Sequence, residues 1–275
     1  MRVAPFGAPA VIRLRWIAAP RTVNVVYLTL LACAAAAALL VLRYDLYERE
    51  PWPMLIAAAA VGATVMWSIG FLEDATLARC GGPSAGPPLL AVIAAVEEEL
   101  ARLAIVVLIA LLLPRQLNDP IDGLIYGSMV GLGMAVEESR EVLSWMDPLW
   151  LLPATEPVRL LGHLVLGGIT GFAVGMARLA MPGWKLALAQ CVVLSIGIHF
   201  LWDWIAFIVR DRGFMTPAQT VGAVGLMITG MVIYGVLVVR GSRCSREIFA
   251  PGSTLDPWGW PFAGHAADGV RQPGA

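Results

Sequence analysis

Long apolar stretches recur along most of the chain, and they restrict the folds that it can adopt. The chain has 275 residues, of which 59% are hydrophobic and only 14% are charged, and its mean hydropathy is +0.75. About twenty apolar residues in a helix cross the hydrocarbon core of a bilayer with every backbone polar group paired internally. The sequence therefore predicts an all-α, polytopic membrane helix bundle of about seven transmembrane helices. The stretches long enough to cross lie at about residues 24–42, 54–72, 88–113, 121–142, 160–179, 186–209 and 219–239.

The apolar pattern divides the chain into three parts. Residues 1–23 contain four arginines and no acidic residue, which favours a cytoplasmic N-terminal segment. Residues 24–240 form the predicted transmembrane domain. Residues 241–275 are rich in glycine, proline and alanine, so we expect a flexible C-terminal tail. The tail also carries arginines, and seven spans would place the two ends on opposite sides, so charge alone leaves the orientation open.

Charge and cysteine usage argue against two classes of protein. A net charge of −1 and a single lysine leave no basic stripe for nucleic acid. The four cysteines lack the spacing of a thiolate zinc site, and we expect no disulfide framework. The alanine-rich, nearly lysine-free composition is typical of a bacterium with GC-rich DNA, which points to the bacterial plasma membrane.

Three consecutive glutamates interrupt the third apolar stretch at Glu97, Glu98 and Glu99, and Arg102 follows at helical spacing. A charge inside the hydrocarbon core is costly, so such residues mark sites for ions, protons or chemistry. Glu98 and Glu99 lie four and three residues before Arg102, which places all three side chains on one helix face. We expect this face to point into the protein. The plainer alternative is a structural salt bridge between Glu98 and Arg102.

Four further polar residues lie on later stretches, at Glu138, His163, His199 and Asp203. Glu138 and His163 share helical stripes with small residues, which let helices approach closely, so both should face the bundle interior. His199 and Asp203 are four residues apart, so the carboxylate can hold one ring nitrogen and fix the tautomer. An interfacial position is the plainer alternative for His163. The glycines of the two stripes are Gly123, Gly127 and Gly131, and Gly167, Gly171 and Gly175.

These residues lie in motifs that resemble those of the PrsW family of intramembrane proteases, within the CPBP superfamily that includes the CAAX prenyl endopeptidases. The segment EELAR, from Glu98 to Arg102, is similar to the family's Glu-Glu-x-x-Lys motif. DGLIYGSMVGLGMAVEES resembles its second motif, and GHLVLGGITGFAVG and HFLWD resemble its two histidine motifs. YDLYEREPWPMLI is similar to the acidic segment before the family's second span. The match runs in order through about residues 44–205.

The chain departs from the family pattern at two positions. Arg102 stands where family members usually have Lys, and Ser139 stands where they have Asn. A permanent cation at 102 can serve the same pairing role. The register is also open, because Glu97-Glu98-x-x-x-Arg102 fits the wider superfamily equally well. Glu98 belongs to both registers.

The resemblance implies a membrane-embedded endopeptidase. Adjacent carboxyl groups in a medium of low dielectric constant cannot both ionise readily, so one can act as a base and the other as an acid. We expect Glu98 to activate water, Glu99 to share the proton, Arg102 to orient the pair and Asp203 to hold His199. A zinc site formed by Glu138, His163 and His199 is the second choice; otherwise no cofactor is expected. The predicted catalytic residues are Glu98, Glu99, Arg102, Glu138, His163, His199 and Asp203.

The expected partners are the lipid bilayer and a membrane-anchored protein substrate, such as an anti-sigma-factor-like or other single-span protein. Two rival functions stay open. A proton-coupled transporter would use the same acidic and histidine residues as a relay, although no internal repeat is visible. A catalytically silent membrane scaffold is the other.

Overall fold

The computed structural model describes residues 25–45, 49–145 and 151–249. Within these ranges the chain forms seven long α-helices and one short 3-10 helix, η1, so the predicted all-α bundle is confirmed. The helices are α2 (Val25–Leu42), α3 (Trp52–Cys80), α4 (Pro87–Leu112), α5 (Pro120–Trp145), α6 (Thr155–Arg178), α7 (Trp184–Arg212) and α8 (Pro217–Phe249), and η1 spans Gly82–Ser84.

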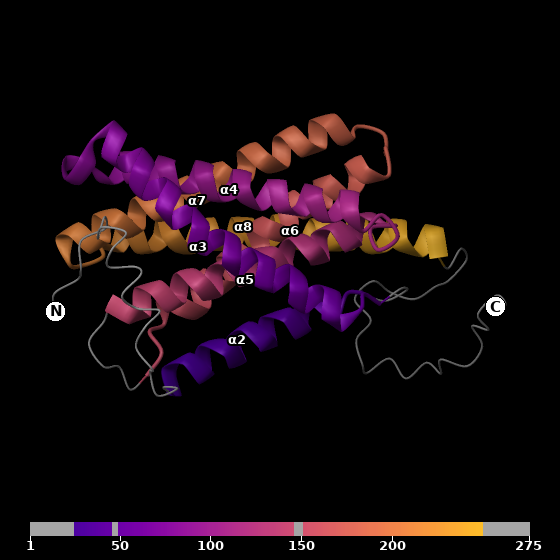
Figure 1. Ribbon diagram of the computed structural model, residues 1–275, viewed down its shortest axis with the longest axis horizontal. Helices are drawn as coiled ribbons and strands as arrows, with labels where there is room; N and C mark the ends of the chain where they lie inside the picture. The colour runs from indigo at the N-terminus through magenta and orange to yellow at the C-terminus, as the bar shows by residue number, and fades with distance from the viewer. Residues whose placement is uncertain (1–24, 46–48, 146–150, 250–275) are drawn as a thin grey trace.

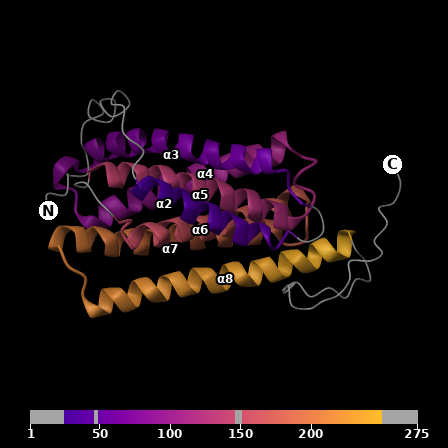
Figure 2. The ribbon, with the colours of Figure 1, turned by 90° about the horizontal axis from the view of Figure 1, so that it is seen from below.

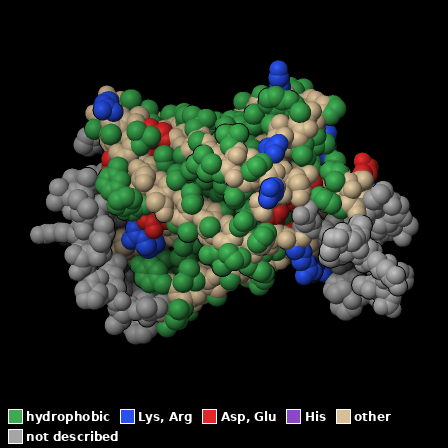
Figure 3. Space-filling model, turned by 45° about the vertical axis from the view of Figure 1, so that its right-hand side comes forward, with side chains coloured by type: hydrophobic (Ala, Val, Ile, Leu, Met, Phe, Trp, Pro, Cys, Tyr) green, Lys and Arg blue, Asp and Glu red, His purple; other side chains and the backbone are tan. Residues whose placement is uncertain are grey.

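Five of the described helices are long and apolar enough to cross a membrane by length and composition, namely α2, α3, α6, α7 and α8. The other two, α4 and α5, carry the acidic clusters at Glu97–Glu99 and Glu137–Glu138. These charged residues lower the mean hydropathy of α4 and α5. Each of the two helices has 26 residues, which is still long enough to cross a membrane. Hydrophobic side chains cover much of the face shown in Figure 3.

The helices run along the long axis of the molecule and alternate in direction (Figures 1 and 2). Helix α5 lies at the centre and packs most extensively against α6, then against α3, while the main partner of α4 is α7. Most of α5 and α6 is buried, and their apolar side chains form the core with those of α2 and α3. The site residues of α4, α5, α6 and α7 are thereby brought to one region of the interior.

The glycine stripes of α5 and α6 are helix–helix contact faces, as predicted, and the structure shows that they face each other. A Cβ atom on Gly127 would lie 2.2 Å from the carbonyl oxygen of Gly167, and one on Gly171 would lie 2.0 Å from that of Gly123. Only glycine permits backbones to approach this closely. A Cβ atom on Gly131 would meet the carbonyl oxygen of His163 at 2.1 Å. The backbone of α6 at His163 therefore packs directly against α5 at Gly131.

Capping motifs define the start of α5. The Asp119 carboxylate accepts hydrogen bonds from the backbone N–H groups of Ile121 and Asp122, and Asp122 accepts from those of Asn118 and Asp119. This reciprocal pattern is a capping box, with Pro120 at the first helical position. Asp122 is thus the returning member of the pair.

Several helices extend beyond the apolar stretches that predicted them. Helix α3 ends at Cys80 rather than near residue 72, and α6 begins at Thr155 rather than near residue 160. Helix α8 continues to Phe249, past residue 240. The hydropathy of a stretch reports the part that is apolar, whereas a helix continues into polar surroundings. The predictions for residues 1–23 and for residues 250–275 of the tail lie outside the described residues.

Candidate active site

One turn of α4 supplies three buried charged groups. Glu98, Glu99 and Arg102 are 4%, 1% and 0% exposed. The Arg102 guanidinium donates through Nη1 to Glu99 Oε1, forming an ion pair within the helix. Glu97 lies on another face, where its Oε1 accepts a hydrogen bond of 2.6 Å from Thr76 of α3. Of the three α4 glutamates, Glu98 and Glu99 are therefore the two that face His163 and His199.

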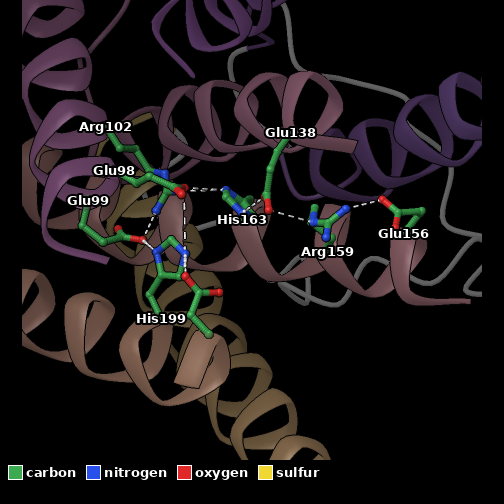
Figure 4. Close-up of polar contacts among 9 residues, drawn as sticks. Glu98, Glu99, Arg102, Glu138, Glu156, Arg159, His163 and His199 are labelled. Atoms are coloured by element: carbon green, nitrogen blue, oxygen red, sulfur yellow. Dashed lines mark hydrogen bonds and ion pairs between the residues drawn. The ribbon is translucent and has the colours of Figure 1, made fainter. Parts of the chain in front are cut away.

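His199 of α7 reaches this turn from the opposite side (Figure 4). Its Nδ1 lies 2.8 Å from Glu99 Oε1, so the ring donates Nδ1–H to that carboxylate. Its Nε2 faces Glu98 Oε2 at 3.8 Å and Asp203 Oδ2 at 3.4 Å. The expected contact between His199 and Asp203 is present, but the shorter contact to the ring comes from Glu99.

His163 of α6 is held through both ring nitrogens. Its Nδ1 lies 2.9 Å from Arg102 Nη2, and because a guanidinium can only donate, Nδ1 is the acceptor. Its Nε2 therefore carries the proton and donates to Glu138 Oε2 at 3.1 Å. The Nδ1 atom also faces Glu98 Oε2 at 3.9 Å. Glu138 and Arg102 together fix the tautomer of His163.

Glu98, His163 and His199 each offer one ligand atom within 4.8 Å of the other two. Glu98 Oε2 is buried and has no hydrogen-bond partner in the described part of the chain. The two imidazole rings lie 5.4 Å apart between centroids. This set differs from the zinc ligands expected from the sequence, because Glu98 takes the place of Glu138. Glu138 instead binds the far nitrogen of His163.

The site holds more negative than positive groups. Its carboxyl groups are those of Glu98, Glu99, Glu138, Glu156 and Asp203, and its guanidinium groups are those of Arg102 and Arg159. If all were ionised and both histidines were neutral, three negative charges would be left over, and the buried Glu73 of α3 would add a fourth. A buried excess of this size is costly unless protons or a bound cation neutralise it. The site is therefore suited to binding a cation or to moving protons.

All seven sequence-predicted site residues meet in this region, and their catalytic roles stay predictions. The sequence missed Arg159 and Glu156, because residues 143–159 lie between two of the apolar stretches and hold three prolines. It also missed Glu73 of α3, which is 8% exposed and interacts electrostatically with Glu98 and Glu138, because it lies just past the apolar stretch that ends near residue 72. Helical spacing was the usable signal, since Glu156, Arg159 and His163 follow one another at three and four residues.

A comparison with protein-family models and a comparison with individual known proteins both match the same family. The family model described as PrsW family intramembrane metalloprotease matches residues 50–239. The protein named Protease PrsW from Geobacillus kaustophilus (strain HTA426) is 26% identical over 172 residues, covering 62% of this chain and 74% of that protein. No solved structure matches the chain. The matched family region includes every residue of the site described above.

Proposed function

Because the chain belongs to the PrsW family of intramembrane metalloproteases, we propose that it hydrolyses peptide bonds of membrane-anchored protein substrates at the Glu98–His163–His199 cluster. The observation that carries the proposal is the Glu98 carboxylate, buried inside a helix bundle and facing one nitrogen of each imidazole at 3.9 and 3.8 Å. Peptide hydrolysis needs a group of this kind to activate water beside the scissile carbonyl.

The surrounding side chains keep this cluster in one arrangement. Glu99 accepts Nδ1–H of His199, so that Nε2 faces Glu98. Glu138 accepts Nε2–H of His163, so that Nδ1 faces Glu98. Arg102 balances the charge of Glu99 and donates to His163. Such preorganisation places the reactive atoms before substrate arrives, and it lowers the cost of reaching the transition state.

A divalent ion such as zinc fits the same donor atoms. Two imidazole nitrogens whose opposite nitrogens bind carboxylates, together with a buried carboxylate oxygen, form a common zinc ligand set. We propose that Glu98, His163 and His199 hold the ion. A bound zinc ion would supply Lewis-acid polarisation of water and of the scissile carbonyl. For His163 Nδ1 to bind the ion, Arg102 would have to give up its hydrogen bond to that nitrogen. Arg102 would still form its ion pair with Glu99.

Proton transfer to the leaving amine falls to Asp203, since both oxygens of Glu138 are paired with His163 and Arg159. The Asp203 side chain is 18% exposed and lies next to Nε2 of His199. A partly exposed carboxyl group can exchange protons with water outside the buried cluster, so Asp203 connects the centre to its surroundings.

We propose single-span membrane proteins as the substrate class and the bacterial plasma membrane as the location. Membership in a protease family favours hydrolysis over the transporter and scaffold alternatives. The substrate class and the location rest on the resemblance and the composition set out above.

Replacing Glu98 with Gln tests the proposed function. Purified protein in liposomes, mixed with a panel of single-span reporter proteins, should cleave at least one of them, and Glu98→Gln should abolish the cleavage while the protein stays folded. Glu97→Gln is the matched control, because residue 97 points away from the histidines. The Gln side chain keeps an oxygen that can accept the hydrogen bond from Thr76 of α3. Full activity of Glu98→Gln, or loss in Glu97→Gln alone, would remove Glu98 from the mechanism.

Metal dependence is tested by element analysis and chelation. We expect about one zinc per chain in the purified wild type, a loss of zinc in His199→Asn, and activity that a chelator removes and zinc restores. Full activity in metal-free protein would instead favour the metal-free mechanism, in which Glu98 itself removes the proton from water.

A further inference from the structure

A line of charged side chains leads away from His163 along α5 and α6 (Figure 4). Glu138 Oε2 binds His163 Nε2, Glu138 Oε1 binds Arg159 Nε at 3.1 Å, and Arg159 Nη1 binds Glu156. Arg159 is thus the bridge between the carboxylate that holds a histidine and a second, fully buried carboxylate.

The two oxygens of Glu138 have different partners. Oε2 binds His163 and Oε1 binds Arg159, each at 3.1 Å. A carboxylate oxygen that is paired with a guanidinium 3.1 Å away cannot turn without losing that ion pair. Arg159 therefore sets the direction in which Oε2 points, and with it the plane of the His163 ring.

Arg159 is itself fixed by its own helix. Glu156 lies three residues before it and His163 four residues after it, so all three lie on one face of α6. The Glu156 side chain is 1% exposed, whereas that of Arg159 is 21% exposed. The buried Glu156 carboxylate therefore anchors Arg159. The close packing of Gly131 against the His163 carbonyl holds α5 and α6 at a separation that Glu138 can span.

We infer that Arg159 is a positioning residue of the hydrolytic centre, acting on His163 through Glu138. This inference rests on the proposed function where it concerns the reaction rate. Outer groups that orient metal-binding or catalytic histidines typically change activity by about 10- to 100-fold when removed. The same range is expected here.

Kinetics on Arg159→Met provide the first test. We expect kcat to fall by about 10- to 100-fold with KM unchanged, and Arg159→Lys to recover part of the loss because it keeps the charge without the fork. Arg140→Met is the matched control, since Arg140 pairs with Glu137 on the exposed side of α5. It should leave kcat unchanged.

A double variant tests whether Arg159 acts through Glu138. If it does, Glu138→Gln combined with Arg159→Met should be no slower than Glu138→Gln alone. A loss that multiplies with that of Glu138→Gln, a loss confined to KM, or a wild-type kcat in Arg159→Met would each overturn the inference.

A spectroscopic readout separates this inference from the proposed function. The chain has three histidines, so ¹⁵N-histidine labelling gives a spectrum in which His163→Gln identifies the His163 signals. Arg159→Met should shift the Nε2 resonance of His163 because its hydrogen bond to Glu138 is altered, whereas Arg140→Met should not. An unchanged resonance would overturn the positioning role. If the wild type cleaves no substrate, the proposed function fails, but this measurement still decides the role of Arg159.

Discussion

Arg102 connects both histidines to the α4 glutamates, although it is fully buried. Its guanidinium pairs with Glu99, which holds His199, and donates to Nδ1 of His163. Glu99 and His163 accept from its Nη1 and Nη2, whereas its Nε has no hydrogen-bond partner among the described residues, so the ion pair with Glu99 is what offsets the cost of burying this cation. Arginine presents a planar fork, which allows it to reach two partners at once, whereas lysine carries a point charge. This accounts for an arginine at a position where the family usually has lysine.

Substitution of Arg102 tests this role. Arg102→Met should destabilise the protein by about 3–5 kcal/mol, because it leaves the buried Glu99 carboxylate without its charge partner. Arg102→Lys should keep most of the stability, since one ammonium can still pair with Glu99. Thermal unfolding in detergent measures both, and equal melting temperatures for Arg102→Met and the wild type would contradict the account.

At this scale the sequence predicted which residues come together but not all of their contacts. Glu98, His163 and His199 stood out because a charged or ionisable group in an apolar span is costly. The pairing of Glu99 with His199 joins residues a hundred positions apart, and helical spacing carries no information on contacts between helices. Spacing along one helix favoured Asp203 as the partner of His199, and that contact is present but longer.

The α5–α6 pair is the element that determines where the site residues meet. Its glycines recur every four residues on both helices, which predicted close packing from the sequence alone. Which glycine faces which could not be predicted, because that register depends on the contacts of the whole bundle. The structure brings Gly127 against Gly167, and Gly131 against the backbone of His163.

A single methyl group at the centre of this interface should separate the helices. In Gly127→Ala the new Cβ would meet a backbone oxygen at 2.2 Å, which no side-chain motion can relieve, so we expect both lower stability and lost activity. Gly225→Ala on α8 is the control, because no atom lies within 4 Å of its Cβ position. Melting temperature and cleavage rate check both variants, and a wild-type-like Gly127→Ala would refute the close approach.

At the scale of the whole molecule, the apolar stretches predicted the described helices and their order, while several boundaries differ. Residues 73–87 and 143–159 lie between the apolar stretches, yet their described parts are partly helical, and they hold Glu73, Glu156 and Arg159. A high mean hydropathy marks segments with few polar residues. Polar residues that point into the bundle lower the mean hydropathy of their own segment. The residues that hydropathy obscures most are therefore those that surround the site.

The bundle places a charged centre inside a largely apolar molecule. Helices α2, α7 and α8 expose large apolar side chains, including Leu28, Val193 and Val221, whereas α5 and much of α6 lie in the interior. Two carboxyl groups of the site, those of Glu138 and Asp203, have partly exposed side chains. This arrangement suits hydrolysis of a peptide bond within or next to a membrane.

The most direct test of the central claim compares membrane-protein fragments in cells that express the wild-type chain with those in cells that express Glu98→Gln at equal abundance. The account predicts that truncated forms of one or more single-span proteins appear only with the wild type. Identical fragment patterns in the two membranes, with both proteins folded and inserted, would contradict it.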